Sequence, residues 1–168
     1  MSLSIFSRVP DLYWPCKGTS EGFTELNAFD GALLAAGIGD TNLVKMSSIV
    51  PPACKRVDPI KLPGGALVPV AYAAMTSSES GVWVAASVAC GIPTDPSLPG
   101  VIMEFHGNGR GKDAEEHVRE MAKQAFLYRN RELKEIISVS AEAQVPNTAN
   151  CAAAFAAITL WWSDWGKK

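Results

Sequence analysis

The sequence predicts an α/β protein of the α+β type, in which two main helices pack on largely antiparallel β-sheet. Two segments show the spacing of amphipathic helices, and about six or seven others have the apolar or alternating character of strands. Several of these strands follow one another directly, as strands do in hairpins. The chain has 168 residues, 48% of them hydrophobic and 19% charged, so we expect a single domain over residues 1–168 with a sizeable core.

The first helix is predicted over residues 25–36 and the second over residues 112–131. Thr24 suits the N-cap of the first helix, and Asp30 lies beside the predicted buried stripe, which consists of Leu26, Phe29, Leu33 and Ala36. The second helix carries acidic residues near its start, where the helix dipole favours them. Its predicted apolar face consists of Val118, Met121, Ala122, Ala125 and Phe126.

The remaining apolar segments are predicted to be strands. They cover residues 3–9, 41–46, 66–75, 82–90, 101–106, 133–143 and 150–162. The run at 82–90 is almost continuously apolar, as expected for a strand that is covered on both faces. The segments between them are rich in proline and glycine and are predicted to be loops, including residues 11–22.

Charge and composition exclude several classes of partner. The net charge is −2 and the pI is near 5.7, so neither a nucleic acid nor an anionic membrane is expected as a partner. No apolar stretch reaches the ~20 residues of a membrane helix, and the N-terminus lacks a signal-peptide pattern, so we expect a cytoplasmic protein. The four cysteines are scattered and suit reduced thiols, and His106 and His117 suit neither a metal site nor a Ser–His triad.

The segment 43–52 is the most unusual part of the chain. An extended apolar run ends in Ser47 and Ser48, and Pro51 and Pro52 follow shortly afterwards. The prolines lack N–H groups and have a fixed φ, so we expect the Ser47–Ser48 peptide to lie between a strand and a stiff, extended exit. A serine beside such a restrained peptide can attack the preceding carbonyl. Two serines before a proline also occur in ordinary loops, and spacing alone leaves that alternative open.

Residues 39–52 (GDTNLVKMSSIVPP) resemble the processing segment of pyruvoyl-dependent arginine decarboxylases, and residues 100–105 (GVIMEF) support the resemblance, which extends over most of the chain. It implies a four-layer αββα sandwich assembled into trimers or a dimer of trimers, with the active site between protomers. It implies self-cleavage into chains 1–47 and 48–168, with Ser48 converted into a covalent pyruvoyl group and with no need for pyridoxal phosphate or a metal. It further implies that L-arginine forms a Schiff base with this group and yields agmatine and CO₂, for polyamine formation or acid-linked arginine use.

The resemblance also assigns site residues. It places the proton donor at Glu104, in an otherwise apolar strand, although isolated strand carboxylates are often solvated. It matches Asn42 to a residue that assists processing and contacts the pyruvoyl group. A straight strand would separate Asn42 from Ser48 by about 20 Å, so either the chain turns sharply or Asn42 serves a neighbouring protomer.

The same resemblance assigns the recognition of arginine. Asp30 is the expected partner of the substrate guanidinium, because a carboxylate can bind it in bidentate fashion. Leu33 and Ser47 are expected to line the pocket, and core packing is an equal alternative for Leu33.

Three alternatives accompany this interpretation. The chain could be a pyruvoyl-dependent decarboxylase of another amino acid, for which a different residue should replace Asp30. It could also be an uncleaved, non-catalytic assembly subunit, although both serines, Asn42 and Glu104 are present. Finally, residues 107–112 follow a strand and open a helix as a phosphate loop does, but their spacing does not fit a Walker motif, so nucleotide binding is not expected.

Overall fold

The computed structural model describes residues 8–165, which form two helices and nine strands. In sequence order these elements are β1 (Leu12–Gly22), α1 (Glu25–Ala35), β2 (Asn42–Lys45), β3 (Ile49–Val50), β4 (Lys55–Arg56), β5 (Leu67–Ser77), β6 (Trp83–Pro93), β7 (Gly100–Asn108), α2 (Gly111–Tyr128), β8 (Leu133–Gln144) and β9 (Cys151–Trp161).

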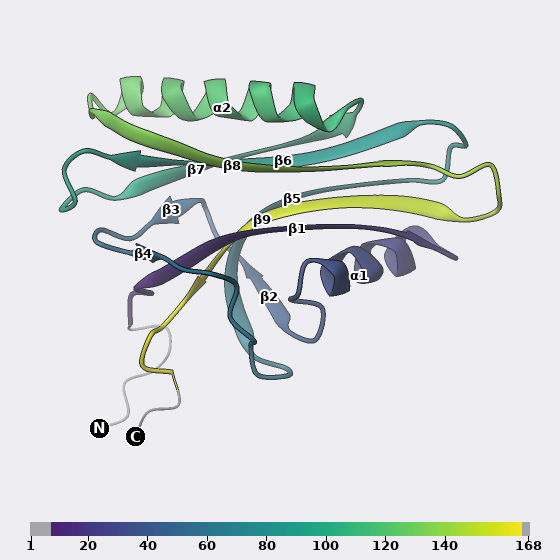
Figure 1. Ribbon diagram of the computed structural model, residues 1–168, viewed down its shortest axis with the longest axis horizontal. Coiled ribbons are helices and arrows are strands. Elements are labelled where there is room, and N and C mark those ends of the chain that lie inside the picture. The colour runs from purple at the N-terminus through teal and green to yellow at the C-terminus, as the bar shows by residue number, and fades with distance from the viewer. Residues whose placement is uncertain (1–7, 166–168) are drawn as a thin grey trace.

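The strands form two sheets that pack face to face, with one helix on each outer face (Figure 1). Sheet A has the order β2-β5-β9-β1-β4, in which the three long strands are antiparallel and the short edge strands are parallel to their neighbours. Sheet B has the order β3-β7-β6-β8 and is antiparallel throughout. Helix α1 covers sheet A and α2 covers sheet B, so the predicted α+β class and four-layer αββα sandwich are confirmed.

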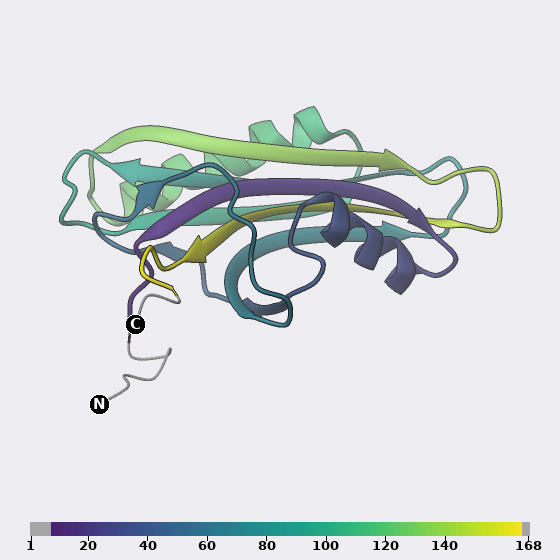
Figure 2. The same cartoon turned by 60° about the horizontal axis from the view of Figure 1, so that its bottom comes forward.

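Small side chains allow these layers to approach one another closely. The layer between the sheets combines alanines of β5, β6 and β9 with larger residues such as Val88, Ile102 and Ile158. On the other side of sheet A, α1 lies against β1 (Figure 2). The helix buries Ala28 and Ala32 on this face. A Cβ atom at Gly18 of β1 would lie 2.1 Å from the carbonyl oxygen of Ala32, so only glycine permits this approach.

Both helices are confirmed, but the buried face of α1 differs from the prediction. The hydroxyl of Thr24 caps α1 by accepting a hydrogen bond from the Asn27 N–H at 3.2 Å. Leu26 was expected in the core but is 74% exposed, and the buried residues are Ala28, Ala32 and Leu33. The reason is that Ala28 and Ala32 lie against the glycines of β1, where the helix approaches the strand closely.

The prediction of a loop at 11–22 is wrong. These residues form β1, an eleven-residue strand that pairs along its whole length with β9. Its glycines, which indicated a loop, instead make room for α1, where a Cβ atom at Gly18 or Gly22 would meet helix backbone. The strand expected at 3–9 lies outside the described residues except for Arg8 and Val9, which are not in a strand.

The other predicted strands correspond to β2, β5, β6, β7, β8 and β9, with ends that shift by a few residues. The described residues contain nine strands, because β1 was predicted to be a loop and the two-residue strands β3 and β4 have no signal in the sequence. Neither helix of the described chain is long and apolar enough to cross a membrane.

Candidate active site

The chain passes from one sheet to the other at the two serines. Strand β2 forms an edge of sheet A, and β3 forms an edge of sheet B, so residues 46–48 bridge the two layers (Figure 1). The Met46 N–H still donates to the carbonyl of Val70 in sheet A, whereas Ile49 already pairs with Val101 in sheet B. The four Cα steps from Lys45, the last residue of β2, to Ile49, the first residue of β3, span at most about 14 Å. Packed sheets lie about 10 Å apart, so the crossing segment has to be nearly extended.

Ser48 adopts a conformation that is uncommon for a residue with a side chain. Its φ is 77°, in the left-handed region, where non-glycine residues store about 1–3 kcal/mol of strain. Hydrogen bonds hold it on two sides. The Ile102 N–H donates to the Ser48 carbonyl at 2.8 Å, and the Ser48 hydroxyl donates to the Glu104 carboxylate. The serine is therefore fixed by β7 at both its carbonyl and its side chain.

Glu104 lies between the sheets rather than in solvent. Its side chain is 17% exposed, and strand alternation places it on the same face of β7 as the buried Ile102. One carboxylate oxygen accepts the Ser48 hydrogen bond, and the other lies 3.6 Å from the Lys45 ammonium nitrogen. The solvated alternative for Glu104 is thus wrong for this chain, and Lys45 is a neighbour that the sequence did not indicate.

The exit from the site is extended only through β3. Val50 is buried and pairs with Gly100, as the fixed geometry of the following proline favours. The expected stiff, extended exit ends at Pro51, because the Cys54 N–H donates to the Pro51 carbonyl and closes a turn. The Ala53 N–H donates to the Pro96 carbonyl at 3.0 Å, which ties this turn to the 93–99 loop.

The remaining predicted site residues lie elsewhere in the single chain. Asn42 begins β2, and its side-chain amide donates to the Gly65 carbonyl at 2.9 Å. Asp30 is exposed on α1, on the outer layer of the sandwich. Leu33 is buried in the core between α1 and sheet A, in keeping with its packing alternative. Ser47 is exposed at the crossing. Within residues 8–165, the structure therefore joins Ser48 to Glu104 and leaves Asn42, Asp30 and Leu33 without contact to this pair.

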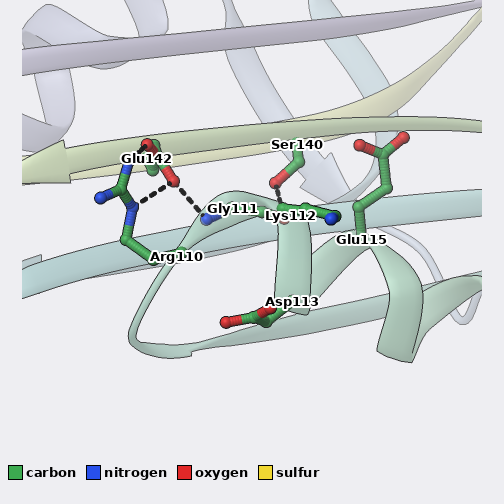
Figure 3. A pocket seen from close by; sticks show the side chains of 7 residues that line it. All are labelled: Arg110, Gly111, Lys112, Asp113, Glu115, Ser140 and Glu142. Carbon is green, nitrogen blue, oxygen red and sulfur yellow. Dashed lines mark hydrogen bonds and ion pairs between the residues drawn. The ribbon is translucent and has the colours of Figure 1, made fainter.

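A pocket of about 310 Å³ lies beside the crossing, and its walls are mostly apolar. Met46 and Ile49, which flank the two serines, contribute to it, together with Val44, Pro51, Leu67 and Trp162. A larger pocket of about 500 Å³ lies at the start of α2 and contains neither Ser48 nor Glu104 (Figure 3).

The carboxylate of Glu142 already occupies the start of α2 in that larger pocket. It accepts hydrogen bonds from the Gly111 N–H and from two nitrogens of Arg110. These bonds, those of Arg110 foremost, lower the pKa of the Glu142 carboxyl below its usual range. The N-terminus of α2, which the 107–112 segment precedes, is thus occupied by the carboxylate of Glu142.

The fold and the site together define a class of protein. It is an αββα sandwich in which the chain crosses between the sheets at a serine in the left-handed conformation, whose hydroxyl donates to a carboxylate of the facing sheet.

Comparison with known proteins narrows the class to one family. The family model described as pyruvoyl-dependent arginine decarboxylase matches residues 13–164. The chain is 46% identical over 160 residues to the pyruvoyl-dependent arginine decarboxylase of Methanocaldococcus jannaschii, covering 95% of each chain. It is 46% identical over 145 residues to that of Methanococcus vannielii, covering 86% of this chain and 87% of the relative, and 41% identical over 143 residues to that of Pyrococcus furiosus, covering 84% and 89%. The chain belongs to the pyruvoyl-dependent arginine decarboxylase family, and the predicted family is confirmed.

Proposed function

We propose that this protein cuts itself between Ser47 and Ser48 and then decarboxylates L-arginine to agmatine and CO₂, as its family membership indicates. The observation that carries the proposal is the hydrogen bond from the Ser48 hydroxyl to Glu104, at a serine in the left-handed conformation. The cut would yield the chains 1–47 and 48–168.

Self-processing follows from this geometry. Ser48 Oγ attacks the carbonyl carbon of Ser47 while its proton passes to Glu104, and the C–N bond breaks as the Ser48 nitrogen takes up a proton. The resulting ester loses the Ser48 Cα proton, and the Ser47 carboxylate leaves. Residue 48 is then dehydroalanine, whose imine tautomer takes up water and releases ammonia, so that a ketone remains at the new N-terminus.

The surroundings of residue 48 fit a pyruvoyl group. Its carbonyl oxygen already accepts a hydrogen bond from Ile102, and the two-residue strand β3 anchors the chain that would follow it. A pyruvoyl group there supplies an electron-withdrawing carbonyl that stabilises negative charge on the substrate when CO₂ leaves. Glu104 stands beside it, in position to return a proton to the substrate α-carbon.

Recognition of arginine is assigned to Asp30 and a second copy of the chain. Asp30 is exposed on α1 together with Leu26, and Phe23 is exposed just before the helix begins. Leu26 and Phe23 are large apolar side chains that a neighbouring protomer would cover. We therefore place Asp30 at the rim of a site formed between protomers, in a trimer or a dimer of trimers, with Leu33 packed in the core beneath it. The four cysteines are free thiols, three of them buried, which supports a cytoplasmic, reducing location.

Intact-mass measurement of the purified protein tests the proposal. The wild type should give two masses, those of residues 1–47 and of a pyruvoyl-terminated 48–168. Ser48→Ala should stay whole and inactive, whereas Ser47→Ala keeps the attacking hydroxyl and should still be cut. A cleaved Ser48→Ala protein would overturn the assignment of the nucleophile, and an uncut wild type would favour the non-catalytic alternative.

Substrate preference is tested separately on the processed protein. Release of CO₂ should be faster from arginine than from lysine, ornithine or aspartate, because a bidentate carboxylate fits a guanidinium best. A preference for one of the other three amino acids would contradict the role of Asp30.

A further inference from the structure

Lys45 is the one lysine that contacts the Ser48–Glu104 pair within the described residues. It is the last residue of β2, three positions before Ser48. Its ammonium nitrogen lies 3.6 Å from the Glu104 oxygen that does not bind Ser48. The same nitrogen lies 4.5 Å from the centre of the Tyr72 ring. Lys45 thus joins the two layers, since Tyr72 belongs to sheet A and Glu104 to sheet B.

The two contacts of Lys45 are directional. Tyr72 packs against Phe155 and Phe29 with ring centres 5.3 and 6.4 Å away, so its face is held at the edge of sheet A. A cation over such a face is attracted to it, which limits where the long lysine side chain can lie. The carboxylate of Glu104 is mostly removed from water, and a buried carboxylate depends on its partners far more than an exposed one does.

We infer that Lys45 is a positioning residue for self-processing, which holds the Glu104 carboxylate with one oxygen turned to Ser48. The inference rests on the proposed function, because it assigns Lys45 a part in that same cut. With the ammonium beside one oxygen, the other oxygen of the carboxylate is left to receive the Ser48 proton. Lys45 does not touch the scissile peptide in this arrangement and acts through Glu104.

Three variants test this role in the full-length protein. Lys45→Met keeps the length of the side chain and removes its charge, and Lys45→Arg restores a charge that can pair with the carboxylate and lie over the ring. The matched control is Lys123→Met on α2, since Lys123 has the same 55% side-chain exposure as Lys45 and also pairs with a glutamate, Glu120, far from the serines. Each variant is prepared unprocessed, and the rate of cutting is followed by denaturing gel and intact mass.

We expect Lys45→Met to slow cutting by about tenfold, which corresponds to about 1.4 kcal/mol in the barrier. Lys45→Arg should recover most of this loss, and Lys123→Met should be cut at the wild-type rate. The thermal unfolding midpoint should fall more for Lys45→Met than for Lys123→Met, because the Glu104 side chain is 17% exposed and that of Glu120 is 56% exposed. The cutting rate is therefore the deciding measurement, since a purely structural role would lower the midpoint and leave the cutting rate of the folded protein unchanged.

A double-mutant cycle tests whether Lys45 affects the cutting rate through Glu104. In a Glu104→Gln background, Lys45→Met should change the cutting rate by less than about twofold, because the charge that Lys45 positions is already absent. An equally large effect in both backgrounds would show that Lys45 does not act through Glu104. If the wild type is cut and Lys45→Met is cut as fast, this inference fails and the proposed function stands. If the wild type is never cut, the proposed function fails first.

Discussion

Gly18→Ala tests how closely α1 must lie against β1. The new Cβ atom would lie 2.1 Å from the Ala32 carbonyl oxygen, 2.8 Å from the Ala36 nitrogen and 3.0 Å from the Ala35 Cβ atom. Two of these atoms belong to the helix backbone and cannot turn aside. To restore ordinary contact, α1 has to move outward by roughly 1 Å, which loses a quarter to a half of the packing attraction along its buried face.

The expected cost follows from that movement. Overpacking of this kind destabilises a protein by about 1–3 kcal/mol. For a chain of this size the thermal unfolding midpoint should fall by about 2–12 °C. The loss can be measured by calorimetry or by circular dichroism, with Gly64→Ala as the control, because a Cβ atom at Gly64 meets no atom within 4 Å.

Two functional measurements on Gly18→Ala, the rate of self-cutting and the KM for arginine, separate the cutting site from the substrate-binding site. Self-cutting should proceed normally in Gly18→Ala, because Ser48 and Glu104 lie on the crossing segment and β7 and not on α1. The KM for arginine should rise, because Asp30 moves with α1. An unchanged unfolding midpoint would refute the reasoning about close packing, and an unchanged KM would remove Asp30 from the substrate site.

Two further predictions concern carboxylates. In Glu104→Gln protein that has been cut, kcat should be lower by about 10²–10⁴-fold with much less effect on arginine binding, and lost binding with turnover preserved would exclude the proton-donor role. Glu142→Gln should cost about 1 kcal/mol by loosening the start of α2. Arg110 lowers the pKa of Glu142, so this stabilisation is present above its ordinary value of 4.5 and is lost as the pH falls through the lower folded value. The midpoints of wild type and Glu142→Gln should therefore converge in acid, and a constant gap would contradict the capping role.

Much of the fold could be predicted because local patterns and tertiary packing agree. Helix α2 has a regular apolar stripe that meets sheet B, and Val118, Ala122 and Phe126 are buried as expected. Strand β1 could not be predicted, because its proline and glycines are typical of loops and only the neighbouring helix explains them. Leu26 was misplaced for the same reason, since the core of α1 is set by what β1 can accommodate.

The site residues also divide into those that the sequence could indicate and those that it could not. Ser48 and Glu104 were predicted from a family-like pattern, and the structure brings their side chains together across 56 positions of sequence. Lys45 was missed, because a lysine at the end of an edge strand is normally solvated and carries no signal of its contact with a distant carboxylate. Asp30 and Asn42 remain predictions, because a single chain does not show which surfaces meet between protomers.

The route of the chain through sheet A has a consequence for how the molecule matures. The two strands described before Ser47, β1 and β2, belong to sheet A, and β1 lies between β9 and β4, which both belong to the later segment. If the peptide is cut as proposed, the shorter fragment stays paired with the longer one through the eleven residues of β1. It cannot dissociate unless sheet A unfolds. After the cut, the two fragments are no longer covalently linked, so once unfolded they can associate again only by diffusion. Refolding should therefore depend on protein concentration after the cut and be independent of it before the cut.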